Sequence, residues 1–349
     1  MIVYKDLYEQ IISPENLFLS WEKFKKDKRG KRDVAKFEFD LERNIFKLHR
    51  DLKDHTYRHG TYFGFYIQDP KVRHIHKATV RDRIVHHAVF RILNFLFEPT
   101  FIPTSFSCRI GKGNHKGVYA LENMARKVSK NYTGPCYALK CDIKKFFDSV
   151  DHGILLEQLD KRIQDEDTMW LLWEIVGSFS TSGTLFEKCG LPIGNLTSQL
   201  FANVYMNEFD QFVKHELKVR HYARYTDDFV ILSETDREFN DLLEKITNFL
   251  HDKLHLSLHP HKVDIRKLHQ GIDFLGYVVF PYHKLPRAKT RRRVVRKLKQ
   301  RAEEYRAEKI EEVTLNSALQ SYIGLLSHAN THSFSQDLKN KLWFWLHDK

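Results

Sequence analysis

Two adjacent carboxylates are the most chemically informative feature of this sequence. They belong to residues 225–228, Tyr-Thr-Asp-Asp, which lie between Arg224 and the apolar run 229–232. The flanking residues are aromatic or β-branched, so the segment predicts a tight β-hairpin with the carboxylates at its tip. Adjacent carboxylates repel each other unless positive charge neutralises both, and a divalent metal ion could supply that charge. The alternative interpretation of these four residues alone is a solvated Asp-Asp turn.

A further carboxylate, Asp142, lies where an apolar strand ends and a segment rich in aromatic residues and lysines begins. We expect it at a strand edge facing solvent, which is a ligand position. Strands of one sheet could bring Asp142 and Asp227 together to hold two Mg²⁺ ions, which take hard oxygen ligands and leave sites open for phosphates. Two such ions can activate a hydroxyl nucleophile and stabilise a leaving pyrophosphate in an in-line displacement.

A helix is predicted between these two segments. Pro192 and two glycines break the chain before Asn195, a good N-cap residue, and apolar residues then recur at helical spacing. Gly194, Ser198 and Ala202 form a stripe of small residues along this segment. The stripe has two interpretations: close packing of the helix against a sheet, or a narrow face that lets a base pair approach.

In this order, the three segments resemble the palm of reverse transcriptases. Asp142 falls in the first palm motif, and residues 225–228 match the Y-x-D-D box. Residues 193–199 are similar to the I-G-x-x-x-S-Q form of diversity-generating retroelement enzymes, whereas group II intron and retroviral-like enzymes usually carry Gln before this Gly and Ser-Pro after it. The resemblance spans roughly residues 60–330. Its outer motifs are residues 71–75, 81–87 and 105–113 in the fingers, and 258–262 and 271–277 in the palm.

The resemblance implies an α+β fold, the right-hand polymerase with fingers, palm and helical thumb. The palm would be an antiparallel sheet backed by helices, and residues 284–286 would form a hinge into the thumb. Fewer than 70 residues follow the palm, so RNase H or endonuclease activity would have to come from elsewhere. The implied divisions are an N-terminal helical lead-in at 1–70, fingers at 71–138, a palm at 139–282 with a finger-like insertion at 160–190, and a basic thumb at 283–349.

The resemblance also implies a set of reacting groups and two Mg²⁺ ions as cofactors. Lys262 aligns with a lysine that protonates the leaving pyrophosphate, although the Thr that commonly follows is Val263 here. Asp228 would be a weaker ligand than the other two aspartates. The implied catalytic residues are Asp142, Asp227, Asp228 and Lys262, and the implied metal-binding residues are Asp142, Ile143, Asp227 and Asp228.

Substrate contacts are carried over in the same way. Phe147 lies where the family places a bulky residue under the nucleotide sugar, so its ring would exclude a 2′-hydroxyl; the alternative is a core aromatic residue beside Phe146. Guanidinium and ammonium groups of the fingers match phosphate oxygens, although each could be an ordinary surface cation. The implied substrate-binding residues are Phe147, Lys71, Arg73, Arg109, Ile193, Gly194, Ser198, Gln199 and Tyr225.

Charge points to a polyanionic partner. The 349 residues carry a formal charge of +12. Residues 284–309 contain twelve Lys or Arg against three Glu, while Val294, Leu298, Ala302 and Tyr305 recur on one helical face. The basic face would follow the phosphates of a duplex, which gives salt-sensitive affinity without sequence choice; a solvated surface helix is the alternative.

These observations predict an RNA-directed DNA polymerase that copies a template RNA into cDNA, with low fidelity opposite template adenines connected to Ile193 and Gln199. Its partners would be template RNA, the RNA/cDNA duplex, dNTPs and a small basic accessory protein. A defence-type reverse transcriptase and a catalytically inactive RNA-binding scaffold remain as alternatives. The four cysteines form no C-x-x-C pair, and no run approaches the roughly 18 apolar residues of a membrane span. A cytoplasmic protein, encoded by a bacterium or phage, is expected.

Overall fold

The N-terminal part of the chain is a layer of helices. The computed structural model describes residues 3–68, 71–181 and 188–347. Trp21 and Phe24 are buried, and so are Ile45, Leu48 and Leu52, which recur at helical spacing along one face. The helices of this layer are α1 (Tyr8–Ile12), α2 (Pro14–Lys25), α3 (Arg32–Phe39), α4 (Leu41–Lys53) and α5 (Val80–Phe97).

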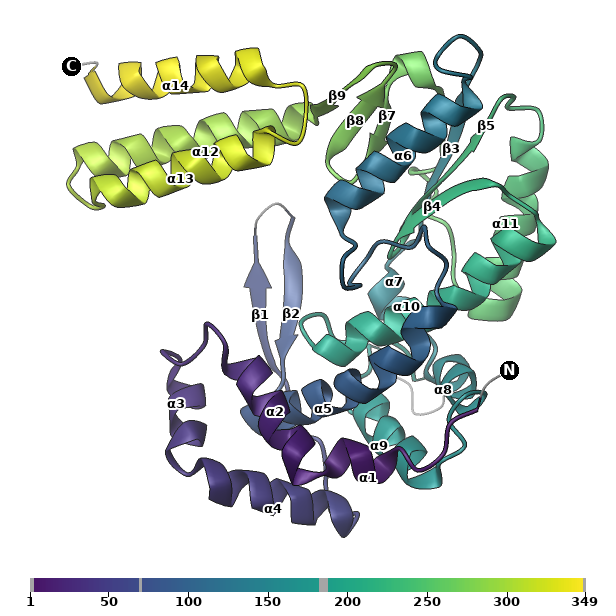
Figure 1. The fold of residues 1–349 in the computed structure, drawn as a ribbon, viewed down its shortest axis with the longest axis vertical. Helices are drawn as coiled ribbons and strands as arrows, with labels where there is room; N and C mark the ends of the chain where they lie inside the picture. Colours follow the sequence, from purple (N-terminus) through teal and green to yellow (C-terminus); the bar gives the residue numbers. More distant parts are fainter. Residues whose placement is uncertain (1–2, 69–70, 182–187, 348–349) are drawn as a thin grey trace.

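A β-hairpin projects from this layer toward the C-terminal helices (Figure 1). Its strands, β1 (Phe63–Ile67) and β2 (Arg73–Lys77), pair antiparallel with each other and form a sheet of their own. The predicted division between residues 70 and 71 therefore falls inside this hairpin and separates two strands that depend on each other. The lead-in and the fingers are better divided before β1.

The central sheet has four antiparallel strands in the order β4-β5-β3-β6. Alternation along the strands sends Leu139 and Ile231 into the large core and Ala138 and Val230 into a second core on the other face. The strands are β3 (Tyr137–Asp142), β4 (His221–Tyr225), β5 (Asp228–Ser233) and β6 (Asp264–Lys267).

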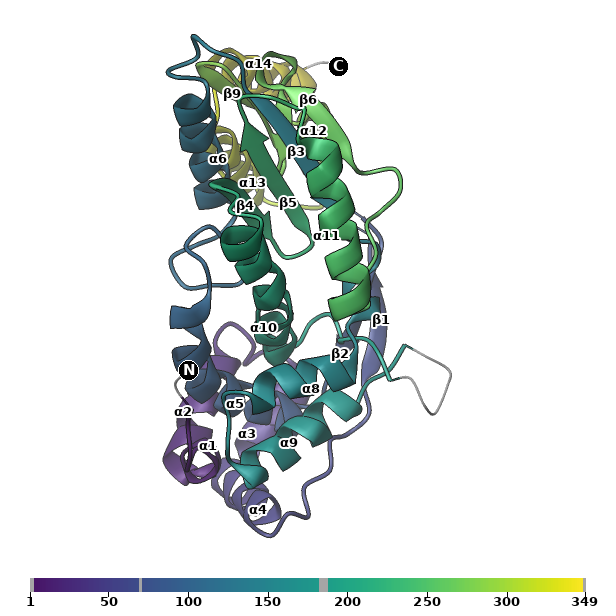
Figure 2. The same cartoon turned by 90° about the vertical axis from the view of Figure 1, so that its right-hand side faces the viewer.

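Helices cover both faces of this sheet (Figure 2). The large core takes in residues of α10 (Leu196–Gln211) and α11 (Phe239–Leu254), and the second core takes in residues of α6 (Asn114–Val128). The antiparallel palm backed by helices is therefore present, and the α+β fold is confirmed. Helix α6 was expected in the fingers, but it packs on β4, β5 and β8 and so belongs to the palm.

A second sheet links the palm to the thumb. Its strands are β7 (Ile272–Phe274), β8 (Tyr277–Phe280) and β9 (His283–Pro286), in that order. Residues 284–286 were expected to be a hinge, but they are part of β9, which pairs with β8 so that Pro286 lies opposite Tyr277. The palm therefore extends to Pro286, and the thumb begins after it.

The thumb is a three-helix bundle formed by α12 (Ala288–Arg306), α13 (Glu312–Leu326) and α14 (His332–His347). Val294, Leu298 and Ala302 are fully buried in its small separate core, so the predicted apolar face of α12 is confirmed. Along the described parts of the chain, no helix is both long enough and apolar enough to cross a membrane.

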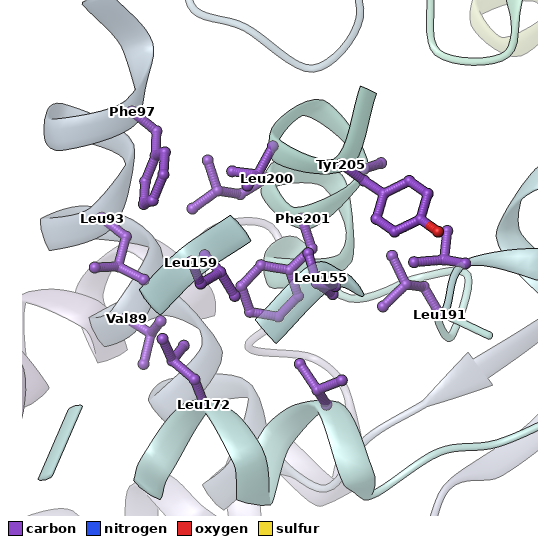
Figure 3. Packing of buried hydrophobic residues seen from close by; sticks show 14 of the residues in the cluster. Val89, Leu93, Phe97, Leu155, Leu159, Leu172, Leu191, Leu200, Phe201 and Tyr205 are labelled. Atoms are coloured by element: carbon purple, nitrogen blue, oxygen red, sulfur yellow. The ribbon is translucent and has the colours of Figure 1, made fainter. Parts of the chain in front are cut away.

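The predicted insertion at 160–190 contributes α9 (Glu166–Gly177), while residues 182–187 lie outside the described residues. The Asp165 carboxylate accepts hydrogen bonds from the amides of Leu7 and Tyr8, which fastens this segment to the N-terminal layer. Apolar side chains of α9 pack with those of α5, α8 (His152–Asp160) and α10 in the large core (Figure 3). The remaining short elements are α7 (Phe146–Ser149), η1 (Glu98–Thr100), η2 (Phe212–Glu216) and η3 (Leu268–Gln270).

Candidate active site

Three aspartates from two distant segments meet at one end of the central sheet. The register of β3 and β5 places Asp142 directly opposite Asp228. Asp227 lies in the tight turn between β4 and β5, and its carbonyl accepts a hydrogen bond of 3.0 Å from the amide of Ile143. The fold therefore gathers the carboxylates that the sequence analysis selected as metal ligands.

The turn that carries Asp227 has an unusual backbone. Tyr225 pairs with Asp228, so only Thr226 and Asp227 connect the strands. Thr226 has a φ of 57°, in the left-handed region, which costs a β-branched residue roughly 1–3 kcal/mol. Its hydroxyl donates to the Ser107 hydroxyl at 2.5 Å, and the Arg224 guanidinium donates to its carbonyl at 3.0 Å. These contacts hold the turn in its strained conformation.

A buried ion pair fixes the position of Arg224. The Arg224 and Asp210 side chains are both 0% exposed and approach to 2.7 Å. The Tyr222 hydroxyl donates to the same carboxylate, also at 2.7 Å. Since Asp210 lies on α10 and Arg224 on β4, the pair joins the helix to the catalytic hairpin.

The cations near the three carboxylates only partly neutralise them. Burial raises the pKa of Asp228 to about 7, and although Lys140 opposes the shift, repulsion from Asp142 and Asp227 adds to it. The pKa of Asp227 is also raised, first by burial and then by Asp142. Lys262 Nζ lies 2.6 Å from Asp142 Oδ1, and Lys140 Nζ lies 3.7 Å from Asp228 Oδ2. Two lysines thus offset only part of the repulsion.

The donor atoms suit a hard divalent cation. Asp228 Oδ1 is buried and has no hydrogen-bond partner, so a metal ion would satisfy an oxygen that the protein leaves unpaired. Ile143 is buried and apolar, so only its backbone carbonyl could be a ligand. As the side chains lie, no group of three or more His, Cys, Asp or Glu in the described residues surrounds a common metal position. The ammonium groups of Lys262 and Lys140 lie beside the Asp142 and Asp228 carboxylates, and a bound metal ion would displace them.

Two of the predicted phosphate-binding cations face the site. Lys71 is exposed and close enough to Asp227 to oppose the burial that raises the pKa of that carboxyl. Burial raises the pKa of the Tyr225 hydroxyl, and Arg73 is close enough to oppose that shift. Both cations come from the β1–β2 hairpin side of the site.

Arg109 is placed differently from its expected role. Its side chain is 6% exposed and forms an ion pair with Glu98 at 2.8 Å. The same guanidinium donates to the carbonyls of Ile102 and Ser105 at 2.7 and 2.9 Å. Because these partners occupy the donors, Arg109 stabilises the loop before α6, and we leave it out of the phosphate-binding set.

The segment before α10 meets the fingers closely. Gly194 has a φ of +119°, and a Cβ there would lie 2.9 Å from Ile75 Cγ2, so only glycine fits. Asn195 occupies the N-cap position, but its amide donates to the carbonyl of His76 at 3.3 Å and makes no capping hydrogen bond. The expected side-chain cap is therefore absent. Ser198 is buried, whereas Gln199 is exposed.

Phe147 lies in the one-turn helix α7, close in the chain to Asp142. Its ring is partly buried and meets Phe146 edge to face at 5.4 Å. The remaining exposure is compatible with contact to a bound nucleotide, while the packing serves the core.

Sequence reasoning missed the residues that support the aspartates. Lys140 could have been found from strand alternation, because it lies two residues before Asp142 and therefore on the same face of β3. Ser107, Asp210 and Arg224 gave no signal of this kind, since their roles depend on contacts between distant segments.

An antiparallel palm with paired aspartates at its hairpin, between a projecting finger hairpin and a basic helical bundle, defines the right-hand polymerase class. The sequence profile of the family described as reverse transcriptase (RNA-dependent DNA polymerase) matches residues 68–279. The chain therefore belongs to the reverse transcriptase family.

Two relatives illustrate the range of this family. The group II intron-encoded protein LtrA of Lactococcus lactis subsp. cremoris is 23% identical over an alignment that covers 99% of this chain and 66% of LtrA. Protein YkfC of Escherichia coli is 26% identical, with 59% of this chain and 63% of YkfC covered. The chain thus spans about two thirds of the length of each relative. A telomerase structure from Candida tropicalis shows a partial likeness, with 10% identity and a TM-score of 0.48 over 70% of this chain and 59% of that one.

Proposed function

We propose that the protein copies a template RNA into cDNA with dNTPs as substrates. The observation that carries this proposal is the meeting of Asp142, Asp227 and Asp228 at the end of the palm, together with the unpaired oxygen of Asp228. Family membership supplies the reaction class.

The proposed roles follow from position. Asp142 and Asp227 are the principal ligands of two Mg²⁺ ions, with the Ile143 carbonyl beside them and Asp228 as a weaker ligand. When bound, the ions would activate the primer 3′-hydroxyl and stabilise the leaving pyrophosphate. Lys262, whose ammonium already lies 2.6 Å from Asp142, donates a proton to pyrophosphate. Lys71 and Arg73 hold the triphosphate from the finger side.

Phe147 is proposed as the sugar gate. Its partly exposed ring follows Asp142 closely in the chain, so a nucleotide held at the aspartates would present its ribose nearby. Replacing it in Phe147→Ala should admit ribonucleotides, measured as the ratio of kcat/KM for dNTP to that for rNTP. An unchanged ratio would assign Phe147 to the core alone.

The direct test is primer extension on an RNA template with and without Mg²⁺. Asp227→Asn should lower dNTP incorporation by at least about a thousandfold, because metal ligands supply several kcal/mol to the transition state. RNA binding, measured by fluorescence anisotropy, should be retained. Asp241→Asn is the matched control, since Asp241 is an exposed carboxylate that pairs with Lys245 on α11. Equal synthesis by Asp227→Asn and wild type would defeat the proposal.

We further propose the diversity-generating subtype, with low fidelity opposite template adenines and a small basic accessory protein as partner. The support is the sequence of residues 193–199, with Ile193 where many relatives carry Gln, and the placement of Ile193 and Gly194 against β2. An apolar side chain there removes a hydrogen-bonding group from the wall beside the incoming base pair.

An intron-associated reverse transcriptase is the second candidate, because the alignment with the intron-encoded LtrA takes in 99% of this chain. The two candidates differ in a measurable error spectrum. Sequencing cDNA made on a template of known composition should show misincorporation concentrated at adenines for the diversity-generating subtype. An even spread over all four bases would favour the intron-associated candidate.

A further inference from the structure

The first turn of α10 is anchored by other segments and not by its own cap. The Asn195 side chain at the N-cap position is engaged with His76, and the His76 amide in turn donates to the Ile193 carbonyl at 2.9 Å. Within this turn the Thr197 hydroxyl lies 2.6 Å from His86 Nδ1, on helix α5. Ser198 lies in this turn and Gly194 directly precedes its N-cap residue, and both are expected beside the nascent base pair.

The hydrogen bonds around His86 form a directed chain of neutral groups. We assign the tautomer in which the Thr197 hydroxyl donates to His86 Nδ1 and the His86 proton lies on Nε2, which faces His59 Nε2 at 3.1 Å. His59 Nε2 must then accept, which places the His59 proton on Nδ1, where it meets the Gly60 carbonyl at 2.7 Å. The Tyr62 hydroxyl lies 3.3 Å from the same His59 nitrogen. With this assignment His86 donates from one ring nitrogen and accepts at the other.

The surroundings of His86 keep it in this state. The side chain is buried, and its pKa lies well below the ordinary value because of burial first and then the neighbouring His59, His87 and Arg83. Asp82, the nearest acidic residue along α5, is engaged by the hydroxyls of Tyr57 and Thr79. The chain therefore joins the 57–62 segment, α5 and α10, and the His86–Thr197 contact within it is buried.

We propose that His86 is a positioning residue for the polymerase reaction: through Thr197 it sets the first turn of α10, and with it the wall that the incoming nucleotide must fit. This inference rests on the proposed function for its catalytic consequence. The structural claim, that the histidine chain fixes the first turn of α10, does not depend on catalysis.

The sharpest test removes one hydroxyl without changing shape. Thr197→Val keeps the volume and β-branching of the buried side chain but leaves His86 Nδ1 without a donor. The KM for dNTP should rise about tenfold, as expected for one lost buried hydrogen bond, while kcat changes less than about twofold. Thr197→Ser restores the hydroxyl and should restore KM. Thr247→Val is the control, because the Thr247 hydroxyl donates to the Leu243 carbonyl on the exposed face of α11.

Hydrogen exchange separates this inference from the proposed function. In Thr197→Val the amides of residues 196–200 should exchange faster than in wild type, and in Thr197→Ser they should not, whether or not the protein synthesises DNA. A wild type without primer extension would defeat the proposed function and leave the exchange result to decide the positioning role. Unchanged exchange at residues 196–200 in Thr197→Val, or a Ser variant that behaves like the Val variant, would overturn the inference.

Discussion

The end of the palm sheet and the first thumb helix carry opposite charge in opposite environments. In the palm, Asp142, Asp227 and Asp228 are drawn together in a largely buried site, and burial raises the pKa of Asp227 and Asp228. On α12, Arg292 and Arg296 are exposed, and with Lys71 they line a cavity of about 520 Å³ between the finger hairpin and the thumb. The palm concentrates charge where solvent cannot screen it, and the thumb spreads charge where solvent can.

The difference indicates what each region can recognise. Buried carboxylates with fixed oxygens select a small hard cation, because geometry and charge must both match. Exposed guanidinium and ammonium groups select a polyanion of any sequence, because neutralising phosphates and releasing counterions requires no fixed geometry. Substitutions in the palm should therefore lower stability and metal affinity. Substitutions in the thumb should lower the salt-dependent affinity for nucleic acid.

The buried pair behind the catalytic turn should give the largest effect. Arg224→Met leaves the Asp210 carboxylate buried without its counter-charge, so the free energy of unfolding should fall by about 3–5 kcal/mol. Lys245→Met is the control, because it breaks an exposed pair with Asp241 on one helix and should cost about 0.3–0.5 kcal/mol. Urea denaturation measures both. If both variants lost the same free energy of unfolding, the buried Arg224–Asp210 pair would be no more important for stability than an exposed pair.

The raised pKa of Asp228 predicts the next largest effect. A metal ion binds the ionised carboxylate, so apparent Mg²⁺ affinity should fall about tenfold for each pH unit below 7, the pKa that burial gives this group. Asp228→Asn should bind more weakly at high pH and lose this dependence. Isothermal titration between pH 5.5 and 8.5 measures both proteins, and parallel pH profiles would show that Asp228 takes no part in metal binding.

The same group should affect the stability of the metal-free protein. The unfolded carboxyl ionises near its ordinary pKa of about 4, whereas the folded one holds its proton up to about 7. The folded state therefore binds more protons between these values, and the free energy of unfolding should decrease as pH rises from about 4 to about 7. Asp228→Asn should remove that part of the pH dependence.

The sequence predicted that the three aspartates would converge, because each of the two segments that carry them has its own local signal. Strand alternation and the tight turn place Asp142, Asp227 and Asp228, and the apolar spacing of α12 gives the buried face of the thumb. What it missed depends on pairing between segments. The hinge expected at residues 284–286 is a strand because β8 offers it an edge, and the amide of Asn195 turns to His76 because β2 approaches it.

Arg109 shows the same limit for a single side chain. Its residue type fits phosphate, but Glu98 and two carbonyls satisfy it first, and Glu98 lies eleven residues away at the end of another element. Residue type gives the possible partners of a cation. Only the folded chain decides which partner is nearest.

The thumb should give the smallest effect, and a salt titration identifies it. In Arg292→Gln/Arg296→Gln, two exposed cations of α12 are neutralised without disturbing the core formed by Val294 and Leu298. The slope of log affinity for an RNA/DNA duplex against log salt should fall by about 1.8, since each phosphate contact contributes roughly 0.9. Lys341→Gln on α14, where the lysine pairs with Asp337, is the control and should leave the slope unchanged.

The kcat of the double variant at saturating duplex should stay at the wild-type value, because these cations bind the substrate and do not touch the aspartates. A double variant that keeps the full slope would show that the duplex does not contact Arg292 and Arg296, and one that lowers kcat at saturation would show that α12 also affects the chemistry at the aspartates.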